Sequence, residues 1–210
     1  MNFLDDQPIV CLITKGEATD ENIATASRNI LATVELAVDL GISVVQVREK
    51  RLSPRPLFEL IRSLTHLTAN SRTYLLVNSF AGVALAANAD GVHLPENGVS
   101  AAVVRQNLHK DFIIGVSTHS IEAVEKARLD GADFAAFGPV FETPGKGSGM
   151  GLAILSEICA RVRPFPVIGL GGIDENNCES VITAGARGIA AIRSLNDPQS
   201  LRSIMNKLRK

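Results

Sequence analysis

Short apolar runs rich in β-branched residues recur along the chain at fairly even intervals. Because these runs are almost continuously apolar, we expect both of their faces to be buried, as in parallel strands covered by helices. The pattern predicts eight strands, at residues 9–14, 43–48, 73–78, 91–94, 111–117, 134–138, 166–172 and 188–193.

The segments between these runs have the periodicity of helices. Two apolar stripes show it: Ile30, Val34, Ala37 and Leu40, and Leu201, Ile204, Met205 and Leu208. Gly41, Gly131 and Gly185 each follow a helical stretch and precede the next strand, as a glycine at a helix C-terminus does. The chain therefore repeats a strand–helix unit.

Eight such units in 210 residues favour a (β/α)₈ TIM barrel that forms one α/β domain over residues 1–210. With 46% hydrophobic residues, the chain can bury a full core. An open, doubly wound sheet is the alternative, and it is less favoured because no GxGxxG motif follows the first strand.

Charge and cysteine content narrow the class of protein. Lys and Arg number 21 against 22 Asp and Glu, so no bulk charge indicates binding to nucleic acid or an anionic membrane, and a small-molecule ligand is expected. Cys11, Cys159 and Cys178 are too widely spaced to indicate a disulfide framework or a CxxC metal site. We expect a cytoplasmic protein that is neither secreted nor membrane-spanning.

Polar residues gather where the predicted strands end, and in a barrel the loops at these ends build the active site. The candidates are Gln46, Arg48, Glu49, Lys50, Asn78, Ser79, His93, Ser117, His119, Glu142, Thr143 and Lys146. For several of these residues, a purely structural role is the alternative interpretation. Arg48, Glu49 and Lys50 can be a solvated charge cluster, and Asn78 and His93 can be hydrogen-bonded rim residues. Ser120 can cap the next helix, with His119 as a bystander.

Two further strand-to-helix turns resemble a phosphate site. "LGGIDENN" follows the seventh strand and "AAIRSL" follows the eighth. The backbone N–H groups of Gly171, Gly172, Ile192 and Arg193 can converge there on a phosphate, which glycine lets approach closely. The alternative is that the glycines serve tight turns only.

The motifs "VVQVREK", "LLVNSFAGVALAANADGVHLP", "IIGVSTHS", "GADFAAFGPVFETPGK", "PVIGLGGI" and "GARGIAAIRSL" resemble, in order, those of the thiamin phosphate synthase and thiazole tautomerase superfamily. This resemblance covers the second to the eighth strand. It implies a (β/α)₈ barrel and a ligand that carries a thiazole or pyrimidine phosphate.

The synthase branch joins a pyrimidine diphosphate to thiazole phosphate with Mg²⁺. The resemblance implies one aspartate directly after Asn78 and another a few residues after His93. Ser79 and Gly98 stand there instead, and only Glu96 is nearby. Mg²⁺ prefers carboxylate oxygens, so these positions disfavour a magnesium site. Gly145 also replaces a family threonine.

The segments "VHLP" and "VFET" are more similar to the tautomerase branch, which needs no metal or cofactor. That branch aromatises the thiazole synthase product to carboxythiazole phosphate by moving a proton. The resemblance places the catalytic histidine at His119, a residue type that titrates near neutral pH. The synthase branch frequently carries a histidine here too, so this residue supports the superfamily more than the branch. Gln46, Arg48, Lys50, Asn78, Thr143 and Lys146 would bind the rest of the substrate.

Two other functions stay open: a Mg²⁺-dependent synthase, and a non-catalytic regulator that binds a thiazole phosphate. The sequence shows no helix-turn-helix or basic arm for direct action on DNA. A homo-oligomer is expected, with a subunit number that the sequence does not define.

Overall fold

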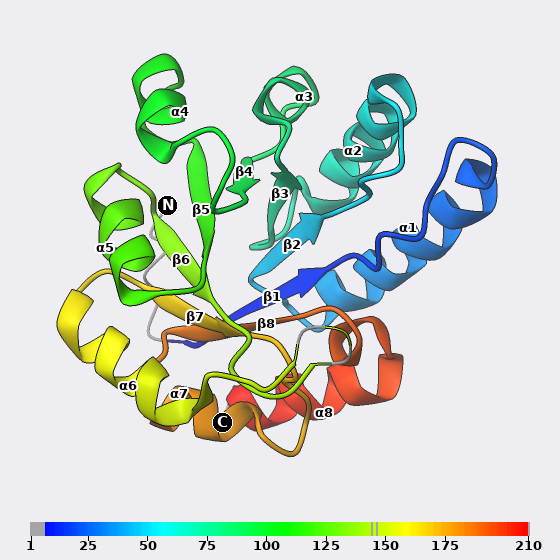
Figure 1. The fold of residues 1–210 in the computed structure, drawn as a ribbon. Helices are drawn as coiled ribbons and strands as arrows, with labels where there is room; N and C mark the ends of the chain where they lie inside the picture. Colours follow the sequence, from blue (N-terminus) through cyan, green and yellow to red (C-terminus); the bar gives the residue numbers. More distant parts are fainter. Residues whose placement is uncertain (1–6, 144, 146, 210) are drawn as a thin grey trace.

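Eight parallel strands close into a barrel in the computed structural model, which describes residues 7–143, 145 and 147–209 (Figure 1). The strands are β1 (Ile9–Ile13), β2 (Val44–Val47), β3 (Tyr74–Asn78), β4 (Gly91–Leu94), β5 (Ile113–Thr118), β6 (Phe134–Phe137), β7 (Val167–Leu170) and β8 (Gly188–Ala191). Pairing of β1 with β8, from Ile9 opposite Gly188 to Leu12 opposite Ala191, closes the sheet. The predicted barrel is confirmed, and the open sheet is excluded.

Helices alternate with the strands and surround the barrel, as Figure 1 shows. They are α1 (Ile23–Asp39), α2 (Pro54–Thr68), α3 (Ala81–Ala86), α4 (Ala101–Asn107), α5 (Ile121–Leu129), α6 (Gly151–Val162), α7 (Cys178–Thr183), the 3₁₀ helix η1 (Ser194–Asn196) and α8 (Pro198–Leu208). Gly41, Gly131 and Gly185 follow α1, α5 and α7 with positive φ, so the predicted helix ends are confirmed. In the described part of the chain, no helix is both long and apolar enough to cross a membrane.

The apolar side chains form two cores because strand residues alternate between the faces of the sheet. One core fills the barrel interior: Ile9, Cys11, Ile13, Val44, Leu76, Ile113, Phe134, Ala136, Ile168 and Ala190. The larger core lies between the strands and the helices. Burial on both faces explains why the strands are almost continuously apolar.

Several strands begin or end at residues that differ from the predicted ones. The predicted strand 166–172 ends at Leu170, because Gly171 and Gly172 adopt φ values of 99° and 65° and leave the extended conformation. The fifth strand begins at Ile113 instead of 111 and continues to Thr118. His119 therefore comes directly after the strand.

Candidate functional site at the carboxyl ends of the strands

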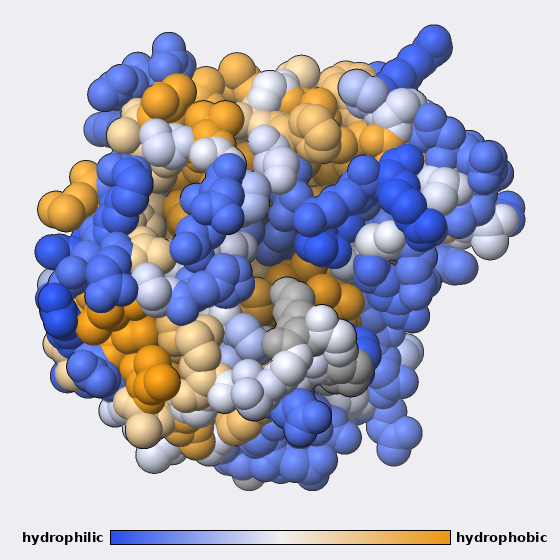
Figure 2. All heavy atoms as spheres, in the orientation of Figure 1, coloured by the Kyte–Doolittle hydropathy of each residue, from blue (hydrophilic) through white to orange (hydrophobic). Residues whose placement is uncertain are grey.

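The polar residues predicted to form the site meet at the carboxyl ends of the strands. Figure 2 shows hydrophilic residues gathered across the middle of the visible face. Gln46 is buried, and its Nε2 donates to Asn78 Oδ1 at 3.1 Å. Asn78 Nδ2 in turn donates to Ser79 Oγ at 2.8 Å. The structure thus brings together Gln46 and Asn78, two residues predicted to bind substrate.

Glu49 contradicts the interpretation of residues 48–50 as a solvated charge cluster. Its side chain is buried, and its two carboxylate oxygens accept hydrogen bonds from Gly16 N at 3.0 Å and Ala18 N at 2.8 Å. These bonds compensate the burial of the charge. Glu49 therefore anchors the loop between β1 and α1, and the predicted ligands Arg48 and Lys50 flank it.

Arg48 and Lys50 lie beside that anchored loop. Arg48 N donates to Thr14 Oγ1 at 2.8 Å, and the Arg48 guanidinium lies against Gly16. Arg48 is half-buried and Lys50 is exposed. Arg48 thus contacts the loop between β1 and α1 through its backbone N–H and its guanidinium.

His93 is a buried residue of the barrel interior. It is 2% exposed, its Nε2 is 2.8 Å from Ser117 Oγ, and its ring packs near Phe134 with 5.8 Å between ring centroids. An added side chain at Gly115 would meet both rings, so this glycine makes room for them. Burial lowers the pKa of His93 to about 4, so the ring is neutral at pH 7.

Two buried polar atoms remain without a hydrogen-bond partner in the described part of the chain: Gln46 Oε1 and His93 Nδ1. Such atoms are costly to bury unless a water molecule or a ligand meets them. Gln46 lies near the carboxyl end of β2 and His93 near that of β4, with β3 between the two strands. They mark this end of the interior as the place where a polar ligand group can be accommodated.

We expect acid to destabilise the fold through His93. Its pKa is about 4 in the folded chain but about 6.5 in an unfolded one, so the unfolded chain binds more protons between these values. The contribution of neutral His93 to the free energy of unfolding is complete above pH 6.5, and it decreases by about 3 kcal/mol as the pH falls to 4. Urea unfolding from pH 7 to 4 measures it.

The control for this prediction is His93→Gln, which is neutral throughout and can still bond Ser117. Its free energy of unfolding should depend less on pH in that window. An identical pH dependence in both proteins would contradict the assignment of this effect to His93.

His119 follows β5 directly and lies at the mouth of the barrel. Its Nδ1 is 2.5 Å from the carbonyl oxygen of Gly138 at the end of β6. Since a carbonyl only accepts hydrogen bonds, Nδ1 carries the hydrogen and Nε2 is the atom that can take up or release a proton. The side chain is 55% exposed, so a ligand can reach it.

Ser120 and Glu96 are two neighbours of His119 with different roles. Ser120 caps α5, because its Oγ accepts a hydrogen bond from Ala123 N at 3.1 Å, which is the structural role that the sequence left open for it. Glu96 Oε2 lies 4.0 Å from His119 Nε2. Sequence reasoning did not pair Glu96 with His119, because the two residues belong to different loops and share no motif.

The positions at which synthases carry metal-binding aspartates do not fit Mg²⁺ here. Ser79 has a positive φ of 67° and offers a hydroxyl in place of a carboxylate. Its Oγ accepts a hydrogen bond from Asn78 Nδ2. Gly98 closes a turn in which Gly98 N donates to Pro95 O at 3.0 Å. A Cβ added to Gly98 would lie 2.8 Å from Pro95 Cγ, so this turn resists a carboxylate side chain. These two positions therefore supply neither of the carboxylates that Mg²⁺ prefers.

The two turns predicted to hold phosphate are joined to each other. Ser194 Oγ, after β8, donates to Ile173 O, after β7, at 2.7 Å. Among the described residues, no hydrogen bond uses the backbone N–H groups of Gly172 or Arg193. These groups can therefore donate to an anion, with Gly171 and Ile192 adjacent in the same turns.

The loop between β6 and α6 packs on these glycines. Phe141 N donates to Gly171 O at 3.1 Å, and Thr143 Oγ1 lies close to Gly171. The predicted ligand Thr143 therefore lies beside the phosphate turn. Lys146, the other ligand predicted in this loop, lies outside the described residues.

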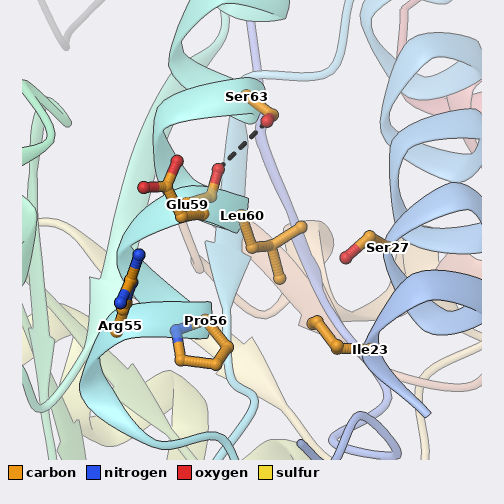
Figure 3. Close-up of a pocket in the computed structure, with 7 residues that line it drawn as sticks. All are labelled: Ile23, Ser27, Arg55, Pro56, Glu59, Leu60 and Ser63. Atoms are coloured by element: carbon orange, nitrogen blue, oxygen red, sulfur yellow. Dashed lines mark hydrogen bonds between the residues drawn. The ribbon is translucent and has the colours of Figure 1, made fainter.

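A groove of about 340 Å³ lies elsewhere, between α1 and α2 on the outside of the barrel (Figure 3). Its walls are Ile23, Ser27, Arg55, Pro56, Glu59, Leu60 and Ser63. Ser63 Oγ donates to Glu59 O, so this hydroxyl is used within α2. None of the predicted site residues lines the groove.

Comparison with known proteins places the chain in a family. Residues 10–195 match the family model described as thiamine monophosphate synthase. A putative thiamine-phosphate synthase of Geobacter sulfurreducens is 43% identical over 180 residues, 84% of each chain. The thiamine-phosphate synthase of Clostridium acetobutylicum is 35% identical over 177 residues, 83% of each chain.

The solved structure of thiamine phosphate pyrophosphorylase from Pyrococcus furiosus superimposes with a TM-score of 0.80 at 29% identity, covering 96% of this chain and 93% of the other. These names support the superfamily inferred from the sequence, and they favour its synthase branch over the tautomerase branch. The chain belongs to the thiamine monophosphate synthase family.

Proposed function

We propose that this enzyme of thiamin biosynthesis is a thiazole tautomerase, which aromatises the thiazole synthase product to carboxythiazole phosphate without a metal. The observation that carries the proposal is the placement of His119. Its Nδ1 bonds to Gly138 O, and its Nε2 is left to exchange a proton at the mouth of the barrel. The misfit of Ser79 and Gly98 to Mg²⁺ supports it.

Different residues of the site would bind the phosphate, the carboxylate and the ring of the substrate. The N–H groups of Gly171, Gly172, Ile192 and Arg193 would bind its phosphate. Arg48, Lys50 and Lys146 would meet the carboxylate, and Gln46, Asn78 and Thr143 would orient the ring. Such positioning leaves the proton shift to His119.

Mg²⁺-dependent thiamin phosphate synthesis is the second candidate. The observation that favours it is the name shared by the relatives, one of them 43% identical. This chemistry would need a metal to neutralise the pyrophosphate that leaves. The Ser79 and Gly98 positions argue against that step in this chain.

Metal removal separates the two functions. We expect the purified protein to convert the thiazole synthase product equally well in EDTA and in Mg²⁺, because the proton shift uses side chains only. Offered thiazole phosphate and the pyrimidine diphosphate with Mg²⁺, it should form no appreciable thiamin phosphate. Product formation is followed by chromatography and mass spectrometry.

Robust coupling that EDTA abolishes would refute the tautomerase and establish the synthase. Saturable binding of the thiazole phosphate without turnover of either substrate would instead identify a non-catalytic binding protein.

A further inference from the structure

Glu96 faces His119 from the neighbouring loop of the barrel. β4 and β5 pair side by side, so the segments that follow them are adjacent at the mouth. Glu96 occupies the second position of the Pro95–Gly98 turn, which the bond from Gly98 N to Pro95 O closes. This turn holds Glu96 Oε2 at 4.0 Å from His119 Nε2.

The orientation of the imidazole makes this contact specific to one nitrogen. Nδ1 is occupied by Gly138 O at the end of β6, on the other side of His119. The carboxylate therefore faces Nε2, the nitrogen that exchanges protons. The ring lies between a fixed hydrogen-bond acceptor and a negative charge.

We propose that Glu96 is a positioning residue that acts through His119, an inference that rests on the proposed tautomerase function. In the proton shift, Nε2 takes a proton from a carbon of the substrate, and the C–H electron pair stays in the substrate. The imidazolium then returns the proton to another atom of the same molecule. No electrons are transferred to the protein, and no co-reactant is consumed.

Glu96 contributes while His119 carries the extra proton. A carboxylate about 4 Å away stabilises the imidazolium more than the neutral ring, which lowers the barrier to proton removal. The side chains are 31% and 55% exposed, so solvent screens the attraction and the effect is moderate.

A double-mutant cycle tests this role. Glu96→Gln should lower kcat of the tautomerase about 3- to 5-fold with KM changed less than about two-fold, because the lost charge acts on the transition state. In the His119→Asn background, Glu96→Gln should have no further effect, since Glu96 acts through the imidazole. Glu96→Asp, which keeps the charge, should restore part of the rate.

Glu59→Gln is the matched control, because Glu59 forms an exposed ion pair with Arg62 on α2, away from the mouth. Its kcat should equal that of the wild type. An unchanged kcat in Glu96→Gln, or an equal loss with and without His119, would overturn the role of Glu96 and leave the tautomerase standing. A wild type without tautomerase turnover would overturn both.

Discussion

We expect His119→Asn to lower kcat of the proposed tautomerase reaction by about 10²- to 10⁴-fold, the contribution of a positioned general acid/base, while phosphate affinity should stay nearly intact. Asparagine can still donate a hydrogen bond toward Gly138 O, but it cannot take up a proton near neutral pH. Steady-state kinetics give kcat and KM, and calorimetry with inorganic phosphate gives the affinity.

Two other histidines serve as references for this result. His66 is an exposed residue of α2, and His66→Asn should leave kcat unchanged. His93 is the rival, although its burial and its pKa of about 4 oppose a role as the acid. A His119→Asn protein with wild-type kcat, together with a large loss in folded His93→Asn, would move the proton transfer to His93.

Gly172→Ala should be strongly destabilising and should also weaken phosphate binding. A Cβ there would lie 2.5 Å from Glu142 O and 2.7 Å from Phe141 Cβ, at a φ of 65°. The steric overlap and the left-handed conformation together should lower the free energy of unfolding by about 2–4 kcal/mol. The β6–α6 loop must move away from the phosphate turn, so KM should rise. Urea unfolding and kinetics measure the two effects.

Gly151→Ala is the matched control, because Gly151 also has positive φ but nothing lies within 4 Å of an added Cβ. It should lose about 1–2 kcal/mol, from backbone conformation alone. Arg193→Ala keeps its backbone N–H and should weaken phosphate binding less than Gly172→Ala. Equal destabilisation at positions 151 and 172 would contradict the role of close packing at Gly172.

The barrel was predictable because its signals are local. A buried parallel strand is apolar along its length, and the glycines at 41, 131 and 185 mark helix ends through a conformation that few other residues adopt. Strand ends were less predictable. Leu170 ends β7 because the next two glycines adopt positive φ, which an apolar sequence run does not reveal.

The site was predictable as a set of residues at strand ends, but its contacts were not. The carboxylate of Glu49 is bound by N–H groups of residues 16 and 18, which are far away in the sequence and have no side-chain signature. Glu96 meets His119 only because neighbouring strands bring their loops together. Burial of His93 likewise depends on Gly115, which has no side chain to fill the space.

The Pro95–Gly98 turn also constrains the order in which this chain could gain or lose a metal-binding carboxylate. A side chain at position 98 would meet the ring of Pro95 at 2.8 Å and the Pro95 carbonyl oxygen at 3.2 Å. Aspartate at position 98 is therefore tolerated better after Pro95 has been replaced than before. A mutational path that installs aspartate at position 98 would therefore change position 95 first, and a path that removes it would change position 98 before proline enters at position 95, so the two sites are epistatic.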